Sequence, residues 1–539
     1  MCSSKVIIRL NFLIFLVISS IPVYAGFLDM PEITETPEFE RKSMLRDIDI
    51  PGVKDRDPDP QAGPRLAVKE FRIQGLVEYP ELGITRKAIN LLVEKIRFDL
   101  MAEDKLLQSG YTLEELGELS DLLVDIEEET EKRHVTPIEV QKLVWLIRDQ
   151  RLKRGITLGQ IESIADKITR FYRERGFILA KAYIPKQEVR DGIVTLTLLL
   201  GMLGEVSVVN NTVYSNTTIS SVFDSMLTMP VTSKQVEENL YLINDFPGVM
   251  VSGFFEPGHQ VGDTKLNINT INEDKYSYNL RVDNHGTKDT GEYRAFADFQ
   301  VNNLFGVADF LNLSILTATS PNNTSYWKAF YQTKLFSPRL FINFGASTNQ
   351  FVVDQENSAL NLNGIVSTEE ISAFYKLNRS RVSNDTVELR YQIIGSDLQL
   401  GDLPDIGNAL DEKISTTSLI YKFDFLQEQQ KRLHQGNISY TSGEYIFGNS
   451  YNIDENFEYL TLDYSLLTFF KIPFTESTSR LIFRAGGQYS GKYLSSIAKY
   501  SLAGASRARG FSSSVYSADD AFFTSVDLIF NSPDMFEFS

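Results

Sequence analysis

The chain has 539 residues, enough for about three domains. It is acidic, with 71 Asp and Glu residues against 53 Lys and Arg, and this balance argues against a general nucleic-acid role, which needs a clustered basic face. After residue 25 no stretch stays apolar for the ~18 residues that a membrane-spanning helix needs, which excludes a helical membrane protein.

Residues 1–25 have the pattern of a Sec signal peptide. Lys5 and Arg9 precede an apolar run, and Ala25 is the small residue that signal peptidase requires. We expect cleavage after Ala25, so the mature chain leaves the cytoplasm. A transmembrane anchor is the alternative, but the apolar run is short and Pro22 follows it. Cys2, the only cysteine, lies in the removed segment, so the mature chain has no thiol for a disulfide or a metal site.

Residues 26–64 are rich in proline and contain the acidic turn cluster DRDPDP. Such a segment buries too little apolar surface to fold alone, so it is predicted to be an extended linker. Glu38–Ile48 is its one candidate for a short helix.

Residues 66–75 alternate apolar and polar side chains as a strand does, and a helical insert then spans residues 76–155. Within the insert, Thr112 with Glu115 and Thr136 with Glu139 have the spacing of capping boxes. The insert is either a docking surface for a partner or a decoration packed on its domain, and we favour the decoration.

Residues 157–201 predict a helix, a strand, a turn and a second strand. The helix has one apolar face, and Gly176 can end it with a left-handed C-cap. The strands are Phe177–Ile184 and Ile193–Leu200, separated by a turn at Gly192. Residues 202–272 repeat this α+β pattern, with helices over 217–227 and 233–244 and closing strands over 249–255 and 264–270.

From Tyr276 onward the hydrophobic period is two. Tyr276, Tyr278 and Leu280 alternate with polar residues, and the pattern recurs in about twelve segments of about ten residues, the length with which a tilted strand crosses a membrane. A soluble β-sandwich or propeller also has alternating strands, but the signal peptide and the strand length favour a transmembrane antiparallel β-barrel. In lipid, a closed barrel is the only all-strand solution because every backbone amide must be paired.

Several runs carry a family resemblance. ITRFYRERGF, YIPKQEV and DGIVTLTLLLG resemble the first polypeptide-transport-associated (POTRA) domain of the two-partner secretion transporters, the haemolysin secretion/activation family. LGEVSVVNN and FPGV are similar to parts of the second POTRA domain. SLAGASRARGF resembles the signature of the family's sixth extracellular loop, whose Arg-Gly-aromatic tip folds back into the barrel lumen. The resemblance implies POTRA 1 over residues 65–201, with the insert 76–155, POTRA 2 over 202–272 and an outer-membrane barrel over 273–539.

In this chain the loop tip is Arg509-Gly510-Phe511. A permanently charged guanidinium in a polar lumen needs a carboxylate, and Asp519 and Asp520 are the candidate salt partners. Gly510 would let the backbone turn sharply beside the arginine.

The resemblance also exposes two departures. Barrels of this family have sixteen strands, four more than the sequence predicts, so we expect that the carboxy-terminal quarter is missing and that this chain alone leaves its barrel open. In the family a helix ahead of the linker can plug the barrel. Glu38–Ile48 is therefore either a plug or part of a mobile periplasmic tail.

The sequence contains no catalytic constellation. Its four histidines are scattered, and no nucleophile elbow, P-loop or dinucleotide fingerprint occurs. We therefore predict a protein that is not an enzyme and that uses no cofactor and no metal.

The resemblance implies an outer-membrane transporter of a Gram-negative cell with its amino-terminal domains in the periplasm. It would export one dedicated, unfolded exoprotein of haemolysin or adhesin type to the cell surface. Its other partners would be outer-membrane lipid and the barrel assembly machinery that inserts it, and it would bind no nucleic acid. The predicted surface for the exoprotein's amino-terminal secretion domain comprises Ile161, Ile164, Ile168, Tyr172, Phe177, Leu179, Tyr183, Val249, Val251 and Phe254.

Two other functions stay open. An assembly factor of the same superfamily would insert other barrels, although such factors usually carry five POTRA domains. A passive porin would explain the barrel and leave residues 66–271 without a purpose.

Overall fold

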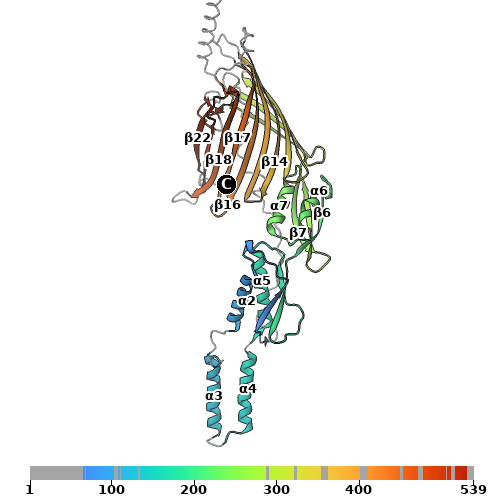
Figure 1. Ribbon diagram of the computed structural model, residues 1–539, viewed down its shortest axis with the longest axis vertical. Helices are drawn as coiled ribbons and strands as arrows, with labels where there is room; N and C mark the ends of the chain where they lie inside the picture. Colours follow the sequence, from blue (N-terminus) through green and yellow to red (C-terminus); the bar gives the residue numbers. More distant parts are fainter. Residues whose placement is uncertain are drawn as a thin grey trace, which may run out of the picture.

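The computed structural model describes residues 65–66, 68–101, 107, 109, 111–130, 134–153, 155–286, 291–320, 324–353, 362–400, 411–448, 453–471, 478–504, 507–511 and 516–530. The predicted signal peptide and the linker with Glu38–Ile48 lie outside these residues. Among the helices that it describes, none is both long and apolar enough to cross a membrane. A helical hairpin, two α+β units and a large sheet follow one another along the molecule (Figure 1).

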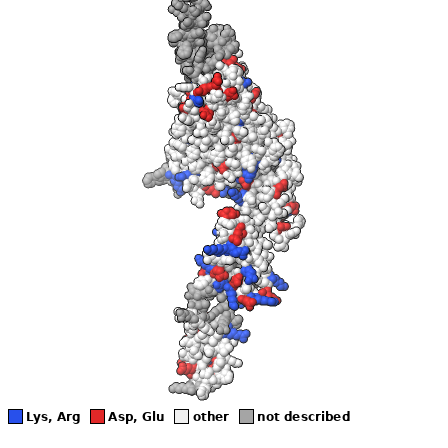
Figure 2. All heavy atoms as spheres, viewed as in Figure 1, with Lys and Arg blue, Asp and Glu red and all other residues white. Residues whose placement is uncertain are grey.

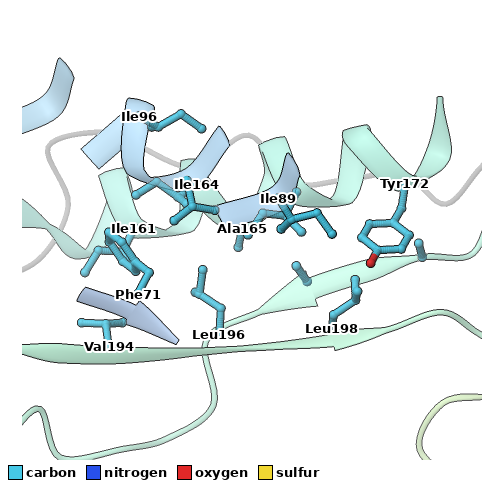
Figure 3. Close-up of a cluster of buried hydrophobic side chains, with 14 of the residues drawn as sticks. Phe71, Ile89, Ile96, Ile161, Ile164, Ala165, Tyr172, Val194, Leu196 and Leu198 are labelled. Carbon is cyan, nitrogen blue, oxygen red and sulfur yellow. The ribbon is translucent and has the colours of Figure 1, made fainter. Parts of the chain in front are cut away.

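The first α+β unit is a three-stranded sheet with two helices on one face. In this sheet the central strand β5 runs parallel to β2 and antiparallel to β4. Helices α2 and α5 cover it, and their apolar side chains meet those of the strands in one core (Figure 3). The elements are β1 (Arg65–Leu66), β2 (Glu70–Gln74), η2 (Pro80–Leu82), α2 (Arg86–Met101), β3 (Ile156–Thr157), α5 (Leu158–Arg173), β4 (Lys181–Tyr183) and β5 (Ile193–Leu199).

The strand predicted over residues 177–184 is shorter than expected. Only residues 181–183 pair with β5, because the chain makes a turn after α5 and directs Phe177 into the core. Gly176 adopts a φ of 96° in this turn, as its predicted capping role requires.

The predicted partner-binding surface is mostly buried, which corrects that prediction. An amphipathic helix in a small α+β unit covers its own sheet, so its apolar face is not available to a partner. In the first unit the buried residues are Ile161, Ile164, Ile168, Tyr172 and Phe177, and in the second they are Val249 and Val251. Leu179 packs against the core of the second unit, and only Tyr183 and Phe254 are exposed.

The helical insert has two parts with different surroundings. Helix α2 packs on the first unit, where Ile89, Val93 and Ile96 join its core, as expected for a decoration. Helices α3 (Leu113–Thr130) and α4 (Pro137–Lys153) instead form a hairpin that projects away from both the unit and the sheet (Figure 1). The decoration prediction is therefore confirmed for α2 and wrong for α3 and α4.

The first predicted capping box opens α3 with both of its hydrogen bonds, and one hydrogen bond of the second box lies at the start of α4. The Glu115 amide donates to Thr112 Oγ1 at 3.2 Å, and the Thr112 amide donates to Glu115 Oε2 at 2.8 Å. At the start of α4 the Thr136 amide donates to Glu139 Oε2 at 2.5 Å.

The second α+β unit has the same plan. Its central strand β8 runs parallel to β6 and antiparallel to β7, and α7 packs on β7. The helix predicted over 217–227 is a short α-helix that continues as a 3-10 helix. The elements are β6 (Met202–Val209), α6 (Asn216–Ser220), η4 (Ser221–Met226), α7 (Ser233–Asn244), β7 (Val249–Pro257) and β8 (Asp263–Asn272).

Gly201 connects the two units without a flexible linker. It lies between β5 and β6 with a φ of 76°, and its carbonyl accepts from the Val231 amide at 2.9 Å. A Cβ at this position would lie 2.5 Å from Leu179 Cβ. The backbone conformation and the close approach both require glycine here.

We expect Gly201→Ala to lower the free energy of unfolding by about 1–3 kcal/mol, because it adds backbone strain and a clash. The measurement is the urea midpoint of the purified protein, followed by proteolysis of the α+β units. Gly117→Ala on α3 is the matched control. A Cβ there meets nothing within 4 Å, and alanine favours a helix. Equal midpoints for the two variants would contradict this account of the junction.

The third part is one antiparallel sheet of twelve strands in sequence order, with β9 and β22 at its edges among the described residues. The strand count agrees with the prediction, although β13 to β18 are longer than the expected ten residues. The strands are β9 (Tyr276–Asp283), β10 (Tyr293–Asn302), β11 (Phe310–Ser320), β12 (Thr324–Lys334), β13 (Leu340–Val353), β14 (Leu362–Arg379), β15 (Ser383–Leu400), β16 (Glu412–Gln427), β17 (Arg432–Phe447), β18 (Asn456–Lys471), β19 (Thr478–Tyr489) and β22 (Ala521–Ile529).

The two faces of this sheet differ in polarity, as the alternation predicts. On one face of β9, Tyr278 and Leu280 are 80% and 73% exposed. The opposite face, called the inner face below, carries polar and charged cross-strand neighbours such as Arg390 with Ser418 and Asp298 with Ser314. The outer face is therefore apolar and the inner face is polar.

Candidate functional site

The connection between β19 and β22 packs on the inner face of the sheet. It contains η6 (Ser496–Ala498), β20 (Tyr500–Ser501) and β21 (Ser517–Ala518). Ser496 Oγ donates to Glu412 Oε2 on β16 at 2.9 Å, and Gln488 Nε2 on β19 donates to the carbonyl of Ala498 at 3.2 Å. Leu494 is buried in a cluster with residues of β16 and β18. The loop is thus fastened by apolar contacts as well as hydrogen bonds.

The predicted tip arginine reaches a carboxylate on β22. Arg509 Nη2 lies 2.7 Å from Asp527 Oδ2, and Arg484 Nη1 on β19 bonds the same oxygen. Asp527 faces Ile482 in the β19–β22 register, on the same side of the sheet as Arg484. Two guanidinium groups from different elements therefore share one acceptor on the inner face.

The other two tip residues contribute less than the arginine. Gly510 does not have a positive φ, and a Cβ there would meet nothing within 4 Å. The backbone at this position therefore does not make the expected glycine-dependent turn. The Phe511 ring is about half exposed and makes an edge contact with Tyr516, with ring centroids 5.4 Å apart.

Asp519 and Asp520 do not pair with Arg509, which corrects the predicted salt partners. Asp519 accepts from the Leu494 amide at 3.0 Å and lies 3.7 Å from Lys499 Nζ, while Asp520 accepts from the Ser490 amide at 2.6 Å. Eight residues of extended chain at ~3.3 Å each separate Asp519 from Asp527. The tip therefore runs back along β22 to a point far from the carboxylates that flank the loop.

A second arginine of the loop was missed by the sequence analysis. The Arg507 guanidinium stacks over the Tyr500 ring at 4.2 Å and bonds the Ser501 carbonyl. It lines a cavity of about 550 Å³ together with Asp463, Lys422 and Arg484 of the inner face. The first arginine of SLAGASRARGF was the signal that could have identified it.

A buried ion cluster joins the second unit to the sheet. Asp245, which follows α7, accepts from Lys376 Nζ at 2.8 Å and from Arg379 Nε and Nη2 at 2.7 Å each. Glu238 of α7 makes a second link to Arg339, with 2.7 Å between the charged atoms. Burial alone would raise the pKa of the Asp245 carboxyl, but the Lys376 and Arg379 charges outweigh it and hold that pKa below its ordinary value.

Apolar packing continues across the same junction. Phe341 of β13 and Ala308 of the β10–β11 turn are buried in the core of the second unit, and Asn303 Nδ2 donates to the Val213 carbonyl at 3.0 Å. The ion cluster opens on a cavity of about 740 Å³ lined by inner-face side chains, including Glu388 and Arg390. The second unit is thus fixed beside a polar cavity of the sheet.

The described part of the chain contains no candidate metal-binding site. There, no group of three His, Cys, Asp or Glu side chains is placed to hold an ion. Several charged side chains of the loop and the junction, such as Arg509 with Asp527 and Asp245 with Lys376, form ion pairs that hold elements together.

Two family models match different parts of this architecture. Residues 262–538, just over half of the chain, match the haemolysin secretion/activation protein ShlB/FhaC/HecB, and residues 139–201 match the ShlB-type POTRA domain. The chain belongs to the ShlB/FhaC/HecB family. This membership confirms the resemblance drawn from the sequence and identifies the first α+β unit as containing a POTRA domain.

Curated relatives of this ShlB/FhaC/HecB family chain are named as transporters, and two of them show the extent of the match. The heme/hemopexin transporter protein HuxB of Haemophilus influenzae (strain 86-028NP) is 33% identical over 171 residues, which cover 31% of this chain and 30% of HuxB. The outer membrane transporter CdiB of Dickeya dadantii is 24% identical over 367 residues, 67% of this chain and 64% of CdiB. The matched region therefore spans less than two thirds of the length of each relative.

Two solved structures share the fold. CdiB from Escherichia coli aligns with a TM-score of 0.60 at 16% identity, covering 88% of this chain and 78% of that one. CdiB from Acinetobacter baumannii aligns with a TM-score of 0.55 at 16% identity, covering 98% and 84%. The order of α+β units and large antiparallel sheet is thus a feature of the fold.

Proposed function

We propose that this protein exports one dedicated exoprotein across the outer membrane by two-partner secretion. The observation that carries the proposal is the loop of a ShlB/FhaC/HecB family chain anchored through Arg509 to Asp527 on the polar inner face of its sheet. The inner face carries polar and charged side chains, so an unfolded polypeptide can pass along it, and the apolar outer face suits contact with outer-membrane lipid. The α+β units lie on the periplasmic side, and the barrel assembly machinery inserts the sheet.

The α+β units receive the exoprotein's amino-terminal secretion domain. Because the apolar helix faces are buried, the recognition elements are sheet edges. Of the edge strands β2, β4, β6 and β7, we assign β4 and β7, which carry the exposed Tyr183 and Phe254. An extended chain can add to such an edge through backbone hydrogen bonds. The chain then passes along the inner face, and its folding outside the cell prevents its return. The protein performs no covalent chemistry and needs no cofactor.

The test is the amount of exoprotein in the culture medium and in the periplasm, with and without the gene for this protein. We expect the exoprotein of the neighbouring gene to reach the medium only when this protein is present. A general loss of outer-membrane proteins would instead favour an assembly factor. A change confined to uptake of small solutes would favour a porin.

A further inference from the structure

The α3–α4 hairpin exposes many large apolar side chains that the packing of its two helices leaves uncovered. Two polar ties hold its helices together: Gln150 Nε2 donates to the Glu115 carbonyl and to Glu118 Oε2, both at 3.0 Å, and Lys142 Nζ pairs with Glu129 at 2.9 Å. Among the described side chains of the two helices, the buried apolar contribution is Ile126 alone. The exposed large apolar side chains are Leu113, Leu123, Val124, Ile138, Val140, Val144 and Trp145.

Helical spacing divides the hairpin into two faces. The Lys142–Glu129 pair marks the side called the polar face below, which also carries Glu118 and Asp149. On α4 this side also presents two exposed apolar side chains, Ile138 and Trp145, which lie three or four residues from Lys142 or Asp149. On the other side of the helix–helix contact, spacing places one apolar face, defined here by Leu116, Leu123, Val140, Val144 and Ile147. Val140 and Val144 are 50% and 59% exposed. The hairpin surface turned to the viewer in Figure 2 is largely uncharged, with an acidic patch at its edge.

The net charge of the hairpin indicates which kind of partner can bind to this apolar face. Helix α3 carries eight carboxylates and no basic residue, while α4 carries four basic and two acidic residues. The net charge is therefore negative, which disfavours a second copy of the hairpin and an anionic membrane surface. It favours a polypeptide that is amphipathic and rich in lysine or arginine.

The position of the hairpin indicates where such a polypeptide comes from. It lies at the end of the molecule farthest from the large sheet, beyond the first α+β unit (Figure 1). In the proposed orientation this is the part of the protein that reaches deepest into the periplasm. A chain on its way to the sheet meets it first.

We propose that the apolar face of the α3–α4 hairpin docks a basic, amphipathic segment of the exported polypeptide before the two α+β units bind it. This inference rests on the proposed export function and adds a first contact site to it. Apolar side chains of the segment cover Leu123, Val140 and Val144, and its basic side chains face the carboxylates of α3. Docking is therefore weakened by salt.

The first experiment measures binding to the full-length protein in detergent micelles. Cys2 is the only cysteine in the sequence, so a cysteine-free background allows one introduced site. A polarity-sensitive dye is placed at Val144→Cys on the apolar face or at Asp149→Cys on the polar face. The probes are an 18-residue amphipathic Leu/Lys peptide and its Leu/Glu counterpart.

We expect the Leu/Lys peptide to change the dye signal at position 144 but not at 149, and the Leu/Glu peptide to change neither. The double variant Val140→Ser with Val144→Ser should weaken binding at least about tenfold, and Gln141→Ser with Lys142→Ser is the matched control. Equal binding of the two peptides, or equal loss in both double variants, overturns the proposal.

The second experiment identifies the occupant in cells. A photoreactive benzoylphenylalanine replaces Val144, or Lys142 as the control, and adducts are recovered while the exoprotein is being secreted. An adduct with the exoprotein at position 144 supports the proposal. An adduct with a second copy or with another periplasmic protein, or none, overturns it. If secretion does not depend on this protein at all, the proposed function has failed instead.

Discussion

Asp527→Asn should reduce export of the exoprotein by at least about tenfold while the sheet still folds. The substitution leaves Arg484 and Arg509 side by side without their shared carboxylate, and each charge-assisted hydrogen bond contributes about 1.5–3 kcal/mol. The contribution of Arg509 is at the low end because its side chain is half exposed. The loop tip then no longer stays on the inner face.

A graded series tests this role of the anchor. Arg509→Ala should have a smaller effect than Asp527→Asn, because Arg484 still neutralises the carboxylate. Lys499→Ala, which removes a loop cation 3.7 Å from Asp519, is the control and should export normally. The structural readout is trypsin cleavage after Arg507, a site that every variant of the series keeps, and this cleavage should accelerate in the same order. Fast cleavage with normal export would show that docking of the tip is not needed for transport.

Asp245→Asn should uncouple the second α+β unit from the sheet. The change leaves Lys376 and Arg379 buried next to each other without a counter-charge, a situation that costs about 3–5 kcal/mol. We expect a large fall in the denaturation midpoint of the junction and a loss of export. The midpoint can be followed by proteolysis between the second unit and β9. Glu205→Gln removes an exposed carboxylate paired with Lys265 in the same unit and should change little.

The same carboxyl predicts the pH range in which the junction weakens. The pKa of Asp245 is lower in the folded protein than in the unfolded chain, so its contribution is complete above the ordinary carboxyl pKa of about 4. It is lost as the pH falls through the depressed folded value. The junction should therefore keep its stability from neutral pH down to about pH 4 and lose it below. The Asp245→Asn variant, already weakened at neutral pH, should not show this further loss in acid. Weakening between pH 5 and 7 would point to another group.

Local patterns predicted the elements well because each depends on neighbouring residues. The capping box of Thr112 and Glu115 and the period-two strands after Tyr276 are set by spacing of three and two residues. The features that sequence reasoning missed depend on contacts between distant segments. Asp527 was overlooked because loop residues nearer to Arg509 offered carboxylates, and the fold of the loop decides which one is reached.

Whether an apolar helix face is buried within the protein is harder to predict from the sequence. The apolar face of α5 was correctly located, but periodicity cannot tell whether such a face meets the protein's own sheet or a partner. Ile161 and Tyr172 proved to be core residues, whereas the apolar side chains of α4 remained uncovered. The hairpin's projection could not be predicted either, since α2 and α3 are both amphipathic and only their connections decide which of them reaches the first unit.

The two-residue connection at Gly201 has a consequence for how a captured chain is passed on. The Ser233 amide of the second unit donates to the Gly176 carbonyl of the first at 2.8 Å, and Leu179 packs across the boundary, so the two units form a stiff arm. The Asp245 cluster continues this arm into the sheet. In the proposed export function, a segment held by the first unit would therefore be kept at a nearly constant distance from the sheet, and its effective concentration there would be set by geometry. Transfer then becomes an intramolecular step whose probability does not depend on how dilute the exported chain is in the periplasm.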